Sequence, residues 1–460
     1  MAGDKETQSA ARDEQRDASA QQGASQQPAH DRGKGASQQP AHDRGYIDRI
    51  IAAARELDAR DAFEALPSQV GRRISAAQAK RTTAMHARNS RRITIAFAIA
   101  LVIIAAISLC LPYYGVGSQG QSGGVYTPDV VIASWQLWFK MTVMPLFDDT
   151  LYNQCTRMLT DFSSVYGIGT YTLVINRTAV TFLVVLCGVM LALSGMLFQT
   201  SFRNPLAAPT MLGVSDGVTL GGIIYCLLGY INITDKPALY ALLVYGMGAV
   251  VVAFVLLASR ALSGGKRYSI MDMLLLGTVV CQLLGGANQF IQNFVMDDAT
   301  WANFYDVQQA SNALTEPLLQ LVVVVVFLIT FCITFILRFK LNLVSFDNDD
   351  GEMMGVRTGV LRGAALVLGS AMQLAALASI GQVAMLSMAV PFLVRYLMAA
   401  DFKTQFLGNC LVGSTMLLIC MVFQHFIVIG VTTPPVGTIV SVLVVPFFVW
   451  AIALSKGRWV

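Results

Sequence analysis

Charged residues are scarce in most of this sequence. Of its 460 residues only 13% are Asp, Glu, Lys or Arg, and 55% are hydrophobic, whereas soluble domains are about one-quarter charged. Residues 1–92 hold 28 of the charged residues, and residues 93–460 hold the other 32. This scarcity excludes a soluble enzyme, and a net charge of only +4 argues against nucleic-acid binding. We therefore predict that a lipid bilayer surrounds the main body of the protein.

The sequence also lacks the motifs of an ATPase and of a metal site. The phosphate-binding pattern GxxxxGK[ST] does not occur, and Gly264-Gly265-Lys266 lacks both the preceding Gly and the following Ser or Thr. No CxxC pattern or Cys/His cluster occurs, and seven of the eight cysteines fall in apolar runs. We expect no catalytic residues, no cofactor, no metal and no disulfide. If ATP drives this protein, a separate subunit hydrolyses it.

Ionisable residues are nearly missing from the centres of the apolar runs. The polar residues there are mainly neutral, namely Gln282, Asn288, Gln289, Gln373 and Gln424, with His425 late in one run. Proton pumps and ion-coupled carriers usually need buried Asp, Glu, His or Lys. A secondary transporter is therefore the weaker alternative, and a non-transporting membrane scaffold is another.

The first 92 residues form two segments of different composition. Residues 1–45 contain no Leu, Ile, Val or Phe, so we expect a disordered cytoplasmic tail. The tail repeats GASQQPAHDRG at 23–33 and 35–45, which we interpret as a duplicated linker and not as a metal site. Residues 46–92 are amphipathic and then basic, which is typical of a cytoplasmic segment before a first membrane helix. Residues 93–460 are the predicted transmembrane domain, and we expect no signal peptide.

The main body contains about ten apolar runs of spanning length. A spanning helix needs about 20 mostly apolar residues. We therefore predict an all-α polytopic membrane protein with about ten transmembrane helices. The predicted spans are 93–111, 178–198, 206–230, 238–259, 272–296, 317–337, 363–380, 383–399, 406–429 and 436–454. The seventh and eighth are divided only at Gly381-Gln382.

The positions of the basic residues predict the orientation. With both termini in the cytoplasm, twelve Lys and Arg residues lie inside and only Lys140, Arg157, Arg177 and Lys236 lie outside, as the positive-inside rule requires. An additional span at 130–147 would invert every later loop. We therefore interpret 130–147 as an interfacial helix on the outer face, with Trp135 and Trp138 at the depth of the lipid headgroups.

The stretch 192–217 is the most informative part of the sequence. It reads ALSGMLFQTSFRNPLAAPTMLGVSDG. This stretch closely resembles the signature of FecCD-like permease subunits, which belong to ATP-binding-cassette importers for iron–siderophore complexes and cobalamin. The positions that carry the resemblance are Gln199, Arg203, Asn204, Pro205, Leu206, Pro209, Gly213 and Gly217. In physical terms, Arg203-Asn204-Pro205 predicts a tight cytoplasmic turn in which Asn caps and Pro fixes the entry to the next helix.

Two later stretches extend the resemblance. Residues 342–356 are similar to the family's cytoplasmic segment, which implies that Asp350, Gly351, Glu352, Met354, Gly355, Val356 and Arg357 couple the permease to the ATPase. Without the resemblance, this acidic stretch would be interpreted as a solvated loop. Pro391 and Arg395, and then Pro435 and Gly437, resemble the family's pattern near the C-terminus. The sequence departs from that pattern at Phe392, where His is typical, and at Asn176-Arg177-Thr178, where Arg-x-Pro-Arg is usual.

The resemblance implies a complete transport assembly in the cytoplasmic membrane of a prokaryote. Its partners would be ATP-binding-cassette ATPase subunits, a second permease subunit and an extracytoplasmic substrate-binding protein. The implied cargo is a ferric siderophore, with heme or cobalamin as alternatives. The departures leave open whether the second permease is identical to this chain.

Overall fold

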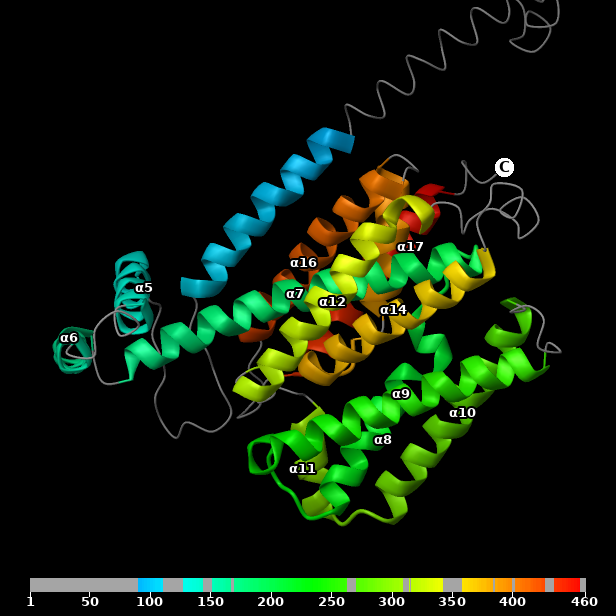
Figure 1. Cartoon of the computed structure of the whole chain (residues 1–460), viewed down its shortest axis with the longest axis horizontal. Helices are drawn as coiled ribbons and strands as arrows, with labels where there is room; N and C mark the ends of the chain where they lie inside the picture. Colours follow the sequence, from blue (N-terminus) through cyan, green and yellow to red (C-terminus); the bar gives the residue numbers. More distant parts are fainter. Residues whose placement is uncertain are drawn as a thin grey trace, which may run out of the picture. The chain divides into compact units, whose positions relative to one another are not determined.

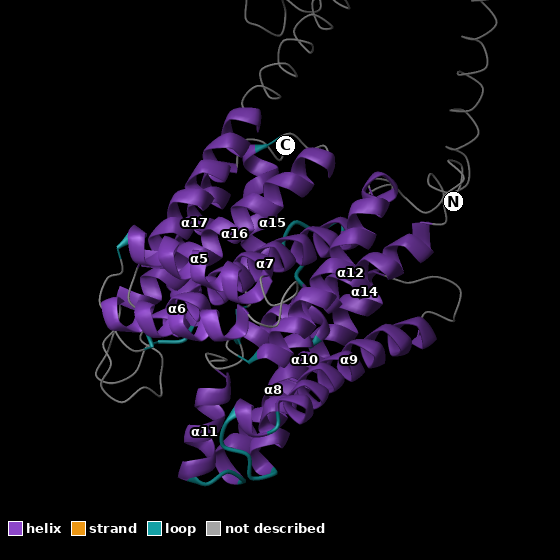
Figure 2. Cartoon of the chain, turned by 60° about the vertical axis from the view of Figure 1, so that its left-hand side comes forward, coloured by secondary structure: helices purple, strands orange, loops and turns teal. Residues whose placement is uncertain are grey.

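The computed structural model describes residues 90–110, 127–143, 151–166, 169–262, 270–308, 314, 316–341, 358–383, 385–398, 402–426 and 434–455. The chain divides into the units Met1–Gln78 and Ala79–Val460, and every described residue belongs to the second unit. The predictions for residues 1–45 and for most of 46–92 lie outside the described residues. Figure 2 shows that the described secondary structure is helical throughout, which confirms the all-α fold class.

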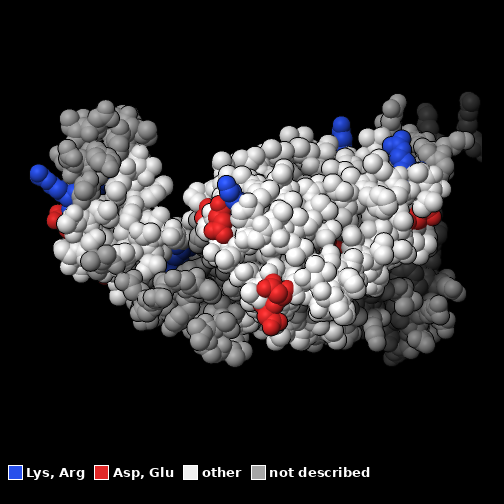
Figure 3. Space-filling model, turned by 90° about the horizontal axis from the view of Figure 1, so that it is seen from below, with Lys and Arg blue, Asp and Glu red and all other residues white. Residues whose placement is uncertain are grey.

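Ten described helices match the ten predicted spans. Seven are long and apolar enough to cross a bilayer, and three are shorter. The long helices are Ser90–Cys110, α7 (Thr170–Phe202), α9 (Pro237–Leu262), α10 (Ile270–Phe294), α12 (Pro317–Leu341), α14 (Thr358–Ile380) and α16 (Phe402–Phe426). The shorter helices are α8 (Val214–Leu227), α15 (Met385–Leu397) and α17 (Val436–Ser455). On the face shown in Figure 3, the described charged side chains form a few isolated groups on an otherwise uncharged surface.

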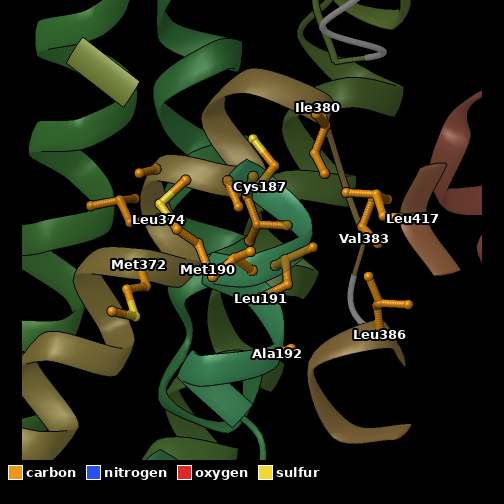
Figure 4. Packing of buried hydrophobic residues seen from close by; sticks show 14 of the residues in the cluster. Cys187, Met190, Leu191, Ala192, Met372, Leu374, Ile380, Val383, Leu386 and Leu417 are labelled. Carbon is orange, nitrogen blue, oxygen red and sulfur yellow. The ribbon is translucent and has the colours of Figure 1, made fainter. Parts of the chain in front are cut away.

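Helix α7 forms the centre of the bundle. It packs against α12, α14, α15 and α16, and Figure 1 shows it running past α12, α14 and α16. In its most apolar stretch 89% of the residues are buried, compared with 6% in the helix Ser90–Cys110. Hydropathy does not explain this difference, because the mean hydropathy is 2.9 for Ser90–Cys110 and 2.5 for α7; the burial of α7 comes from the four helices packed against it. Cys187, Met190 and Leu191 of α7 have no exposed surface and join the cluster shown in Figure 4.

Small residues let the helices around α7 approach closely. A Cβ atom added to Gly188 would lie 2.6 Å from Ser414 Cα in α16, and one added to Gly217 would lie 2.8 Å from Gly248 Cα, where α8 meets α9. Lipid tails are as apolar as Leu, so helices in a bilayer associate through such close packing and through hydrogen bonds. The pairing of α8 with α9 and of α7 with α16 therefore depends on these glycines.

The second and third spans begin at other residues than predicted. Helix α7 starts at Thr170, so Arg177 lies inside the helix and is buried, and its guanidinium donates to the Leu109 carbonyl over 3.1 Å. Asn176-Arg177-Thr178 is therefore not a loop before the span. Helix α8 starts only at Val214, because Pro209–Leu212 forms the 3-10 helix η2 and Gly213 adopts a φ of 76°.

Two further helices lie between the first span and α7. They are α5 (Pro128–Val143) and α6 (Leu151–Tyr166), and α5 contacts both α6 and α7. With 16 residues, α5 is about 24 Å long, shorter than the ~30 Å apolar core of a bilayer. The Trp135 indole donates to Thr178 Oγ1 over 2.9 Å. A helix is thus present over Pro128–Val143, which covers the described part of the predicted segment 130–147, and its position at the outer interface stays a prediction.

Candidate functional site

The chain is not helical between α14 and α15. Helix α14 ends at Ile380, Gly381 has a φ of 79°, and α15 begins at Met385. Because α15 has 13 residues, it covers only about 20 Å, so the residues before it must complete the crossing. Non-helical backbone is tolerated at membrane depth only where protein or a water-filled cavity surrounds it. The Gln382 amide anchors this segment by donating to the Ser215 carbonyl (3.2 Å) and to Thr219 Oγ1 (2.8 Å) of α8.

A cavity of about 300 Å³ opens beside this break. Its walls come from α11 (Asp298–Gln308), from the end of α14, from the break itself and from the start of α17. The lining residues are Tyr305, Gln308, Ile380, Gly381, Gln382, Pro435, Gly437, Thr438 and Ser441. A smaller cavity of about 20 Å³ adjoins it and shares Gln308, Gly381 and Gln382. The walls thus combine neutral hydrogen-bonding groups with exposed backbone.

Two distant stretches singled out from the sequence meet at this cavity. Pro435 and Gly437 line it together with the Gly381-Gln382 peptide. A Cβ atom on Gly437 would overlap the Gln382 carbonyl oxygen. Glycine is therefore required at residue 437, because α17 approaches the backbone of the break at this point.

Asp297 holds the beginning of α11, which carries two of the cavity residues. Its Oδ1 accepts a hydrogen bond from the Thr300 amide over 3.3 Å. The hydrogen bonds from Thr300 lower the pKa of the Asp297 carboxyl below its usual value. The carboxylate therefore acts as a helix cap and compensates the positive end of the helix dipole.

Helix α10, which leads into α11, has an exposed polar stripe. Thr278, Gln282, Gln289 and Asn293 are all exposed and recur on one face of the helix. The neighbouring exposed face is apolar: Val279, Leu283, Phe290 and Phe294 are 64%, 71%, 59% and 76% exposed. The apolar stripe suits contact with lipid. The polar stripe does not, because polar groups in a bilayer face a water-filled space or other protein.

Gly195, Gln199 and Pro391 of the predicted motifs join α7 to α15. Pro391 has no N–H, so it cannot donate to the Ser387 carbonyl one turn earlier. That carbonyl lies against Gly195, where an added Cβ atom would overlap it. The fully buried Gln199 donates from Nε2 to the next carbonyl, that of Met388, over 2.9 Å. Gly195 and Gln199 therefore hold α15 against α7 at the point where Pro391 interrupts the backbone hydrogen bonding of α15.

The remaining residues of the first motif form the predicted turn after α7. Arg203 ends the helix with a φ of 51°, and Asn204 Oδ1 accepts a hydrogen bond from the Leu206 amide over 3.0 Å. Pro205 is partly buried, Leu206 is exposed, and Pro209 starts η2 as a buried residue. Nearby, the Arg395 guanidinium donates to Thr200 Oγ1 over 3.3 Å. The structure thus confirms a tight turn at Arg203-Asn204-Pro205, whereas Asn204 bonds within the turn and caps no helix, because η2 follows Ala208 and α8 follows Gly213.

The predicted coupling residues lie outside the described residues. These are Asp350, Gly351, Glu352, Met354, Gly355, Val356 and Arg357. The described chain ends at Leu341 before them and resumes at Thr358 after them. Their role stays a prediction.

An ionisable residue, Asp216, lies inside a predicted span. This residue is half-buried in the first turn of α8. The Asn288 amide of α10 donates to its backbone carbonyl over 3.0 Å, and the Cys281 thiol lies within hydrogen-bond reach of its carboxyl. The sequence shows this Asp within the predicted span 206–230.

Comparison with known proteins agrees with this arrangement. The family model described as the FecCD transport family matches residues 139–453. The chain belongs to this family. The resemblance stated from residues 192–217 and from the C-terminal motifs is thereby confirmed, and so is the multi-pass membrane location that it implied.

Individual members of the FecCD family show the extent of the similarity. An iron chelatin transport system permease protein of Helicobacter pylori is 28% identical over 278 residues, which cover 60% of this chain and 80% of the relative. The hemin transport system permease protein HmuU of Yersinia pestis is 27% identical over 274 residues, with the same coverage. The vitamin B12 import system permease protein BtuC of Klebsiella pneumoniae is 25% identical over 283 residues, covering 60% of this chain and 81% of the relative.

A solved structure shares the fold. It is an inward-facing ABC transporter assigned to the metal-chelate type. The TM-score is 0.59 at 20% sequence identity, and the match covers 80% of this chain and 99% of the chain in that structure. Membership of the FecCD transport family makes this chain a transport permease subunit.

Proposed function

We propose that this permease moves a ferric siderophore across the cytoplasmic membrane of a prokaryote, with heme or cobalamin as alternative cargo. One observation carries the proposal. An exposed polar stripe on α10 leads, through α11, to a hydrogen-bonding cavity at a broken helix, within the fold of an importer subunit. Proteins similar in sequence are named as permeases for iron chelatin, hemin and vitamin B12.

The pathway that we propose opens on the outer side. In the predicted orientation, α14 ends and α17 begins on the outer face, and α11 follows the outer end of α10. The cavity built from these elements would then receive cargo from an extracytoplasmic substrate-binding protein. The stripe formed by Thr278, Gln282, Gln289 and Asn293 would continue the path through the bilayer.

A second permease subunit completes the pathway in this proposal. The α10 stripe is exposed in the single chain, although such groups need water or protein beside them. Pockets for whole ligands usually measure about 300–1,000 Å³, so the single-chain cavity of about 300 Å³ is at the lower limit for one ligand. Two facing subunits, identical or not, would enclose a larger volume.

Uptake by the reconstituted importer tests the cargo. The permease, its ATPase and the substrate-binding protein are placed in proteoliposomes, and ATP-dependent entry of a ⁵⁵Fe-labelled siderophore is measured against heme and cobalamin. We expect iron chelate to enter only with ATP. Failure of every iron chelate to enter, while cobalamin or heme enters, would refute the siderophore assignment.

The polar stripe gives the next prediction. Replacing Gln282 and Gln289 by Leu should reduce uptake about thirtyfold, because two hydrogen-bonding groups, each worth about 1 kcal/mol, are lost from the path. The matched control is the replacement of Leu283 and Phe290, on the adjacent apolar stripe, by Ile and Leu. If both double variants transport equally well, the polar stripe does not line the path.

The coupling segment is tested separately. We propose that residues 350–357 dock on the ATPase, as the family resemblance implies, and transmit its closure to the helices. Glu352→Ala together with Gly355→Val should therefore reduce uptake about tenfold, equivalent to about 1.4 kcal/mol of coupling energy, while ATP hydrolysis continues. Uptake and hydrolysis are measured on the same vesicles. Unchanged uptake, with normal ATPase co-purification, would contradict the role.

A further inference from the structure

The polar lining of the proposed pathway is neutral in every described side chain. The stripe on α10 consists of hydroxyl and amide groups, at Thr278, Gln282, Gln289 and Asn293. The cavity adds two amides, Gln308 and Gln382, and the hydroxyls of Tyr305, Thr438 and Ser441. These groups can hydrogen-bond a cargo, but they provide no positive charge that would balance an anion in a medium of low dielectric constant.

Asp216 is the ionisable residue that lies beside this lining. Its Oδ1 is 3.6 Å from the position that a Cβ atom on Gly285 would occupy. Gly285 directly precedes the exposed Gly286 of α10, next to the polar stripe. Because residues 285 and 286 are both glycine, no α10 side chain at these positions covers the half-buried carboxyl. Asp216 lies in the first turn of α8, at the positive end of the helix dipole.

Two buried side-chain oxygens next to Asp216 have no hydrogen-bond partner among the described residues. They are Ser215 Oγ and Asn288 Oδ1. Asn288 is 97% buried, since only 3% of its surface is exposed, and its Nδ2 holds the Asp216 backbone carbonyl. A buried acceptor without a donor is costly. A group that brings N–H or O–H donors or a positive charge would satisfy Asn288 Oδ1 and the carboxylate, whereas an anion brings no donor to them; the Ser215 hydroxyl can donate or accept and does not discriminate.

We propose that the importer carries uncharged or cationic ferric chelates, and that Asp216 discriminates against anionic ones. This inference rests on the proposed function. The chemical class that fits is a ferric trihydroxamate, in which three monoanionic ligands neutralise Fe³⁺ and a free amine can add one positive charge. A ferric tris-catecholate carries three negative charges and meets both repulsion from Asp216 and a lining without cations.

The test compares chelates that differ only in charge. Cells of the native host that lack the chromosomal copy express either the native permease or a variant, and ⁵⁵Fe uptake is measured. Two ferric trihydroxamates are used, identical except that a terminal amine is free in one and acetylated in the other. The third probe is a ferric tris-catecholate. Because the substrate-binding protein is the same in every arm, the ratio of variant to native uptake reports on the permease alone.

Asp216→Asn should reduce uptake of the cationic chelate about tenfold relative to the acetylated one, since one ion-pair interaction of about 1.4 kcal/mol is removed. Asp216→Glu should restore the difference. Asp161→Asn, an identical exchange at an exposed residue of α6, should change neither uptake. Immunoblotting of membranes verifies that all variants reach equal amounts.

Three results would decide against the inference. Asp216→Asn could lower both trihydroxamates equally, which indicates a structural role. Asp216→Asn could leave both unchanged at normal protein levels. The native permease could take up the tris-catecholate as fast as the neutral chelate, in which case the importer function stands and the charge selection falls. If native cells take up none of the three chelates, the proposed function itself fails.

Discussion

Gly195→Ala should leave little folded permease in the membrane. The added methyl group would overlap the Ser387 carbonyl oxygen and also lie 3.0 Å from the Pro391 ring. A backbone atom cannot rotate away, so α15 must shift on α7 and the Gln199–Met388 hydrogen bond must lengthen. Overpacking of this kind costs about 1–3 kcal/mol, and we expect the upper end, which lowers the unfolding temperature by about 10 °C.

Gly246→Ala is the matched control for this change. Gly246 also lies within a helix, α9, and an added Cβ atom would meet nothing within 4 Å. Ala favours helix over Gly by about 1 kcal/mol, so this variant should be at least as stable as the native chain. Membrane yield and thermal unfolding of the purified proteins measure both effects. Equal stability of the two variants would show that α7 and α15 are not packed as described.

Gly437→Val should abolish uptake while the protein still folds. The new side chain would collide with the Gln382 carbonyl, which belongs to the wall of the cavity. Helix α17 must then move away from the break between α14 and α15. The cavity would then change shape. We expect uptake to fall by about tenfold or more, because a rise of about 1.4 kcal/mol in the free-energy barrier to transport already slows uptake tenfold.

Gly359→Val provides the comparison for this second prediction. Gly359 is near the start of α14, and an added Cβ atom there meets nothing within 4 Å. ATP-dependent uptake in proteoliposomes and gel filtration of the purified importer are measured for both variants. If Gly437→Val transports normally, the start of α17 does not border the pathway.

The helical class and the ten apolar helices could be expected from the sequence, because each of these helices coincides with an apolar run. Helices α6 and α11 were not predicted, because they are short and not apolar overall. The bundle centre could not be predicted from hydropathy, since α7 has a mean hydropathy of 2.5 and the little-buried helix Ser90–Cys110 has 2.9. The starts of α7 and α8 could not be predicted either. Arg177 lies buried inside a helix, where its guanidinium donates to the Leu109 carbonyl of another helix. This contact depends on packing and not on local pattern.

The candidate site was predicted less completely than the fold. The motifs identified Gln199, Pro391, Pro435 and Gly437, and the division at Gly381-Gln382 was visible as a gap between apolar runs. Their mutual contacts were not predictable, because Gln382 bonds residues more than 160 positions earlier in the chain. The role of Asp216 could not be predicted either, because a single charge in an apolar run can be interpreted only when the neighbouring helix is known.

The continuity of α7 has a mechanical consequence. Its 33 residues extend for about 50 Å, which exceeds the ~30 Å apolar core of a bilayer. One end contacts α5 and α6, and the other ends at the Arg203-Asn204 turn. No loop interrupts this helix, so it joins the α5 and α6 end of the bundle to the Arg203-Asn204 turn as one continuous element. In the proposed importer, a displacement imposed at one end of α7 would therefore shift the other end as well.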